Sequence, residues 1–82
     1  MKDRSVLAEY MRRIKERFPS AHMRLVRPSK GADFVVRIEV APEQTGEVLD
    51  LAAAISYELY RTHRVGIAAN VPGAEQIVGL PA

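Results

Sequence analysis

The 82-residue chain contains no cysteine and no tryptophan, and it has only two histidines. Without cysteine, the sequence excludes disulfide scaffolds, thiolate zinc sites and cysteine nucleophiles, and nothing indicates an oxidising compartment. Long apolar runs are also missing, because charged residues interrupt every hydrophobic stretch before it reaches the length of a transmembrane helix. The first thirteen residues, MKDRSVLAEYMRR, lack the apolar core of a signal peptide. We therefore expect a cytoplasmic protein without a membrane contact.

Charge is distributed unevenly along a chain whose net charge is only +2. Residues 1–41 contain ten basic and five acidic side chains, whereas residues 42–82 contain two basic and five acidic ones. This asymmetry favours an anionic partner near the N-terminal half. It falls short of the dense basic stripe that is typical of strong nucleic-acid binders, and the five aromatic residues form no recognisable stacking motif.

Hydrophobic periodicity predicts a single domain, residues 1–82, with the element order α-β-β-α-β. Apolar residues at helical spacing indicate one helix over residues 4–18, ended by Pro19, and a second over about 46–63. Residues 21–27 and 33–40 alternate as strands around the turn PSKGA, and 64–71 form a third strand. Residues 72–82 are expected to be an irregular tail or an edge strand.

Both helices need one apolar surface, which the inward sides of the strands provide. The fold class is therefore α/β (α+β), a two-layer sandwich with a small three-stranded sheet and two helices on one face. On the first helix, Glu9–Arg13 and Arg12–Glu16 have the i,i+4 spacing of ion pairs. The expected core consists of Ile14, Phe18, Phe34, Val36, Ile38, Leu51, Ile55, Leu59 and Ile67.

The other side of the sheet, which we call the strand face, is expected to be mixed, polar and open to a partner. The alternation places outward on it the candidate interaction residues His22, Arg24, Val35, Arg37 and Asn70. Such a surface suits a protein partner or self-association, to which Val26 and Ala68 would add apolar area.

Ser56 and His63 both fall within the apolar arc of the second helix, which also includes Tyr60. Seven residues of helix separate the serine and the histidine by about 10.5 Å, which is too far for a nucleophile and its base. We expect Ser56 to bond its own helix backbone. His22 and His63 lack the local spacing of metal ligands. We therefore expect no catalytic residues, no metal and no cofactor.

The turn between the first two strands offers Arg27, Ser29, Lys30 and backbone amides to an anion, with Asp33 following at the strand start. From there, GADFVVRIEV and VLDLAAAISYELYRTHRVGIAANV resemble the second strand, helix and last strand of the minimal nucleotidyltransferase family. The resemblance covers roughly residues 7–71. It implies a fold in which three carboxylates hold the magnesium ions that bridge nucleotide phosphates.

Asp33 matches the first of these carboxylates, but Val35 stands at the second position and Gly66 at the third. The loop RPSKG is also shorter than the family's Gly-Ser loop. Two interpretations follow. The first is a non-enzymatic interaction module that acts through its strand face or by self-association. The alternative is a catalytically inactive nucleotidyltransferase-like domain that binds nucleotide or nucleic-acid phosphate through the 27–31 turn.

Overall fold

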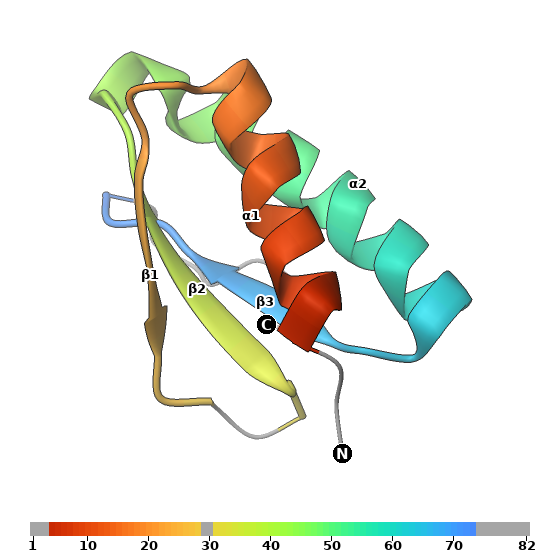
Figure 1. The fold of residues 1–82 in the computed structure, drawn as a ribbon. Helices are drawn as coiled ribbons and strands as arrows, with labels where there is room; N and C mark the ends of the chain where they lie inside the picture. The colour runs from red at the N-terminus through yellow and green to blue at the C-terminus, as the bar shows by residue number, and fades with distance from the viewer. Residues whose placement is uncertain (1–3, 29–30, 74–82) are drawn as a thin grey trace.

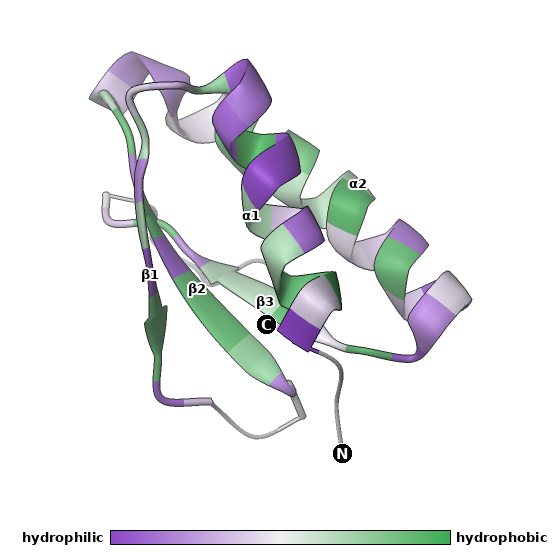
Figure 2. Cartoon of the chain, in the orientation of Figure 1, coloured by the Kyte–Doolittle hydropathy of each residue, from purple (hydrophilic) through white to green (hydrophobic). Residues whose placement is uncertain are grey.

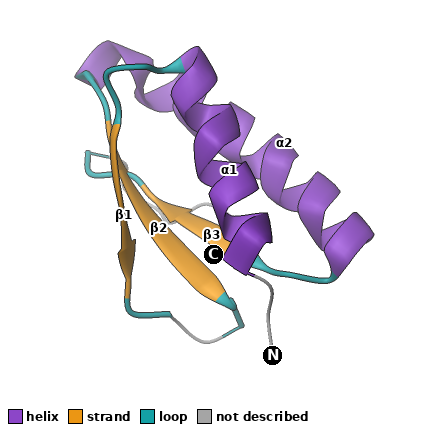
Figure 3. Cartoon of the chain, in the orientation of Figure 1, coloured by secondary structure: helices purple, strands orange, loops and turns teal. Residues whose placement is uncertain are grey.

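A computed structural model describes residues 4–28 and 31–73, and it has the expected fold class and element order (Figures 1 and 3). Pro72 and Gly73 form a turn, and the remainder of the expected tail, 74–82, lies outside the described residues. The elements are α1 (Arg4–Arg17), β1 (His22–Val26), β2 (Phe34–Glu39), the 3₁₀ turn η1 (Pro42–Gln44), α2 (Thr45–His63) and β3 (Ile67–Asn70).

The three strands form one mixed sheet in the order β1-β2-β3. β1 and β2 are the antiparallel hairpin that the alternation predicted, with Leu25 opposite Val36. β2 and β3 run parallel, and α2 is the crossover that parallel neighbours need. The central strand is therefore β2, which contains both apolar and charged residues.

Both helices lie side by side on one face of the sheet (Figure 1). In Figure 2 the central strand β2 is largely hydrophobic, and hydrophobic and hydrophilic segments alternate along both helices. Seven of the nine expected core residues are buried, while Phe34 and Leu51 are partly buried against them. Leu25 points to the helix side but is 41 % exposed, because β1 is an outer strand. The buried members of the core are Val6, Leu7, Tyr10, Ile14, Phe18, Ala21, Val36, Ile38, Val48, Ala52, Ile55, Leu59, Val65, Ile67, Ala69 and Val71.

Ion pairs on the helix layer differ in part from the expected pairs. Arg12 bonds Glu16 at 2.5 Å, as its spacing predicted, and Glu9 at 2.9 Å. Arg13 pairs across to Glu58 of α2 with two bonds of 2.9 and 3.1 Å. The hydrogen bonds and positive charge of Arg13 hold the pKa of the Glu58 carboxyl below its ordinary value. Arg13 therefore connects the two helices, whereas its expected partner was Glu9 on its own helix.

In the part of the chain that the structure describes, neither helix combines the length and apolar composition needed to cross a bilayer.

Candidate functional site

The carboxylate of Asp33 lies where the hairpin turn meets the start of β3. Its Oδ2 atom accepts a hydrogen bond from the Gly66 backbone N–H at 2.7 Å. The backbone N–H groups of Asp33 and Phe34 donate to the Gly66 carbonyl at 2.8 and 3.1 Å. These bonds lie immediately before the first register pair of β2 and β3, Phe34 and Ile67. The carboxylate therefore caps the end of the parallel strand pair.

Asp33 and Gly66 are also the positions that match the first and third carboxylates of the nucleotidyltransferase pattern. The fold brings them into contact, and a Cβ atom at Gly66 would lie 3.6 Å from Oδ2 of Asp33, an ordinary van der Waals distance. Val35, at the second position, is only 4 % exposed. Within residues 4–28 and 31–73, no three acidic or histidine side chains gather into a group that could hold a metal ion. Of the three positions compared with the family pattern, Asp33 alone carries a carboxylate.

The expected anion-binding turn falls only partly within the described residues. Arg27 follows β1 and is exposed, whereas Ser29 and Lys30 lie outside the described ranges. Gly31 has a φ angle of 92°, in the left-handed region that glycine adopts without steric penalty. Of the four candidate anion-binding residues, the structure describes Arg27 and Asp33. The positive charge of Arg27 attracts an anion, whereas the carboxylate of Asp33 repels one.

The register of the sheet arranges the strand face in cross-strand rows. All five residues expected there project from this side, as the alternation predicted. One row pairs His22 with Glu39, the next contains Arg24, Arg37 and Asn70, and the last contains Val26, Val35 and Ala68.

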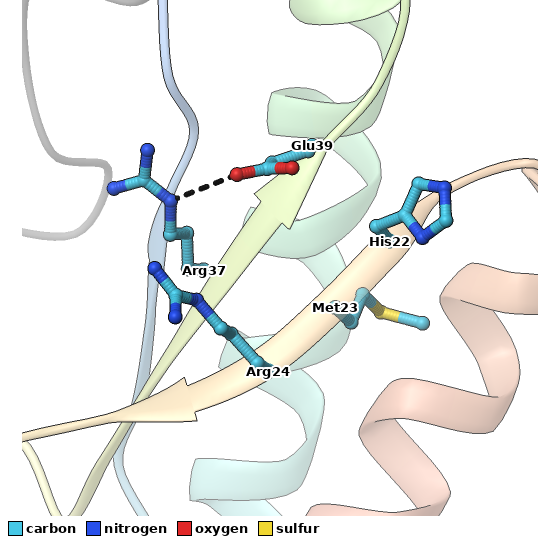
Figure 4. A pocket seen from close by; sticks show the side chains of 5 residues that line it. All are labelled: His22, Met23, Arg24, Arg37 and Glu39. Atoms are coloured by element: carbon cyan, nitrogen blue, oxygen red, sulfur yellow. Dashed lines mark hydrogen bonds and ion pairs between the residues drawn. The ribbon is translucent and has the colours of Figure 1, made fainter.

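Arg24 and Arg37 are directly opposite each other on the antiparallel pair, and their guanidinium groups project to the same side (Figure 4). Arg37 donates through Nε to Glu39 at 3.1 Å. Together with His22 and Met23, these residues line a hollow of about 240 Å³. Like charges directly opposite on neighbouring strands destabilise a sheet. The hollow contains two guanidinium groups, of Arg24 and Arg37, and one carboxylate, of Glu39. Its net charge is therefore positive.

The apolar row of the strand face is less accessible than its sequence suggests. Val35 is 4 % exposed and Ala68 is 6 % exposed, while Val26 is partly buried. We expected Val35 to be an exposed contact, and the structure corrects this expectation. The polar rows, rather than the apolar row, are the accessible part of this face.

Ser56 and His63 both lie on α2, seven residues apart. The Ser56 hydroxyl donates to the Ile67 carbonyl of β3 at 2.5 Å, so the expected bond to its own helix backbone is wrong. Helix α2 packs against β3, which brings the Ile67 carbonyl within reach of the hydroxyl, and sequence spacing does not indicate this contact. His63 is exposed in the last turn of α2, where a cation or donor suits the negative end of the helix dipole.

A second hollow was not anticipated from the sequence. We call it the tyrosine pocket: about 350 Å³ between α2 and the hairpin end. Tyr57 and Tyr60 line it and are 66 % and 51 % exposed. The guanidinium carbons of Arg61 and Arg64 lie 5.7 Å from the ring centroids of Tyr57 and Tyr60, respectively, within cation–π range. The other lining residues are Gly31, Ala32, Ser56, Gly66, Ile67 and Ala68.

Tyr60 was expected within the buried arc of the second helix, and the structure corrects this. The hairpin end and the start of β3 leave a hollow beside this turn of α2, so the ring lines a surface pocket instead of entering the core. The one available signal was the spacing of the two tyrosines, since residues three apart lie on the same side of a helix. Their position opposite Gly31 and Gly66 depends on tertiary structure.

Comparison with known proteins finds no matching family model, no matching curated protein and no matching solved structure.

Proposed function

We propose that this protein is a non-enzymatic interaction module that binds an acidic segment of a partner protein across its strand face. The observation that carries the proposal is the directly opposed pair Arg24 and Arg37, with Glu39 bonded to Arg37. An anion between two guanidinium groups receives charge-assisted hydrogen bonds and removes their mutual repulsion. The carboxylates of an acidic segment can accept hydrogen bonds from both guanidinium groups and can neutralise their charge.

Binding of a fluorescent peptide of alternating Glu and Ser, followed by anisotropy, tests this function. Replacing both strand-face arginines, Arg24→Gln and Arg37→Gln, should weaken binding of the peptide. Each 1 kcal/mol of interaction that is lost raises the dissociation constant about fivefold. The matched control, Arg4→Gln with Arg17→Gln, removes the same charge from exposed sites of α1. Equal weakening in both double variants would show that net charge, and not this pair, attracts the peptide.

Self-association is the other form that an interaction module could take. The burial of Val35 and Ala68 leaves little apolar area on the strand face for a second copy, which favours the acidic partner. Light scattering at micromolar concentrations measures the mass directly. A dimer that disappears in the double variant at Arg24 and Arg37 would replace the acidic partner with a second copy.

The second candidate is the inactive nucleotidyltransferase-like domain. The contact between Asp33 and Gly66 favours it, because the family pattern needs these two positions side by side. A salt titration with a mixed single-stranded oligonucleotide separates the two candidates, since phosphate binding weakens steeply as salt rises. Oligonucleotide binding that depends steeply on salt, is lost in Arg27→Gln and is kept in the Arg24 and Arg37 variants would favour this candidate.

A further inference from the structure

Tyr57 and Tyr60 stand apart from the other large apolar or aromatic side chains of the described chain. Among these residues only Leu25, Tyr57 and Tyr60 are strongly exposed, and the two tyrosines line the same pocket. Tyrosine and arginine are among the residue types enriched where protein interfaces concentrate their binding energy. The pocket therefore presents two exposed tyrosines on a concave surface, with an arginine over each ring.

The walls opposite the tyrosines are small. Gly31 and Gly66 have no side chains, and a Cβ at Gly31 would meet nothing within 4 Å. Ala32 and Ala68 add only methyl groups, and the Ser56 hydroxyl is engaged with the Ile67 carbonyl. A volume of about 350 Å³ bounded by aromatic rings and small residues therefore has room for a large flat side chain.

The charge around the pocket defines what can accompany that side chain. Arg61 and Arg64 lie over the two rings. Two carboxylates lie nearby: Glu58 is paired with Arg13 through two bonds, and Asp33 accepts a bond from the Gly66 N–H at the pocket wall. Because Asp33 repels an anion, the ligand surface that matches is apolar at its centre and acidic on the Arg61 side.

Ala68 lines this pocket and also stands in the row of Val26 and Val35, so the pocket lies at the β3 edge of the strand face. We infer that the tyrosine pocket binds an aromatic side chain of the acidic partner segment, whose carboxylates extend to Arg61 on one side. This inference rests on the proposed function but assigns a separate site and a separate recognition element.

The first experiment tests the pocket without the acidic segment. N-acetyl-phenylalaninamide is uncharged, and N-acetyl-leucinamide is its non-aromatic match. In NMR titrations at millimolar concentrations, the phenylalanine amide should shift the backbone amides of Gly31, Ala32 and Gly66 of the full chain. Shifts confined to other residues, or equal shifts with the leucine amide, would overturn the assignment of the pocket.

The second experiment tests the partner. Two acidic peptides differ only in a central residue, phenylalanine or serine, so both retain the charge that Arg24 and Arg37 recognise. Burying even part of a phenylalanine ring should make the first peptide bind at least about fivefold more tightly. The difference should vanish in Tyr57→Ala and Tyr60→Ala but persist in Tyr57→Phe, which retains the ring.

The outcomes distinguish the two proposals. If only the phenylalanine preference is missing, the acidic-partner function stands and this inference fails. If the pocket binds the phenylalanine amide but neither peptide depends on Arg24 and Arg37, the pocket stands and the acidic-partner function fails. Binding of a single-stranded oligothymidine that is lost in Tyr57→Ala and displaces the peptide would assign the pocket to a nucleic-acid base and overturn the inference.

Discussion

The most informative single substitution is Tyr10→Phe, which removes one oxygen atom from the centre of the helix layer. Tyr10 is 0 % exposed, and its hydroxyl has no hydrogen-bond partner among residues 4–28 and 31–73. A buried polar group without a partner loses its hydration and receives nothing in exchange. Phenylalanine retains the ring and its contacts while removing that group. We therefore expect the variant to be more stable than the wild type, contrary to the usual effect of core substitutions.

Two opposing terms determine the magnitude. Leaving a buried hydroxyl unsatisfied costs about 1 to 3 kcal/mol in protein mutational data. Removing its oxygen leaves a void of roughly 10 Å³, which costs only about 0.2 kcal/mol at the measured dependence on cavity volume. The void term is too small to reverse the sign. The free energy of unfolding should rise by about 1 to 3 kcal/mol.

Urea denaturation followed by circular dichroism measures this change. The midpoint should rise while the slope stays constant, because the two proteins expose the same surface on unfolding. Tyr57→Phe is the matched control: its hydroxyl is on a side chain that is 66 % exposed, so its stability should stay within about 0.5 kcal/mol of wild type. A Tyr10→Phe variant less stable than wild type would show that the hydroxyl has a hydrogen bond in solution.

The pH dependence gives an independent check on Tyr10. Desolvation by burial raises the pKa of its hydroxyl above the ordinary value of 10.0. The unfolded chain then loses this proton first as the pH rises, so the contribution of neutral Tyr10 is complete below about pH 10 and declines above it. The decline reaches at most about 1.4 kcal/mol per pH unit. The stability difference between Tyr10→Phe and wild type should therefore widen above pH 10, and a constant difference would contradict the raised pKa.

Two further predictions concern the core and the sheet end. Ile38→Ala, at a side chain that is 0 % exposed, should lower the free energy of unfolding by about 2 to 5 kcal/mol in urea denaturation; a loss below about 1 kcal/mol would mean that the strand faces are assigned wrongly. Asp33→Ala removes the acceptor of the Gly66 N–H and should cost about 1 to 2 kcal/mol. Neither wild type nor Asp33→Ala should incorporate nucleotide onto protein or RNA acceptors with magnesium or manganese, and wild-type turnover that the variant lacks would restore an enzyme.

Local periodicity was sufficient to predict the elements and their faces. Strand side chains alternate with a period of two, so the apolar residues of β2 could only share one face, and Val36 and Ile38 are buried there. Proline at position 19 ended the first helix, and glycine at position 31 took the positive φ angle that its turn requires. These features depend on neighbours within a few residues, which is why they can be derived from the chain alone.

Several features of the candidate sites required contacts between distant segments. The parallel pairing of β3 with β2 brings Gly66 to Asp33, and the β1–β2 register places Arg24 opposite Arg37. Strand order depends on how the chain crosses over between β2 and β3, and the register of the hairpin depends on its turn, so neither pairing follows from the spacing of those residues alone.

The sequence by itself determined the element order, the two layers, most of the core and which residues occupy the strand face, since each follows from a local period. Tertiary structure alone decided accessibility. Val35 is buried on a face that alternation marks as outward, and Tyr60 is exposed on a helix face that periodicity marks as inward. A period states only the direction of a side chain, whereas exposure depends on what the rest of the folded chain places in front of it.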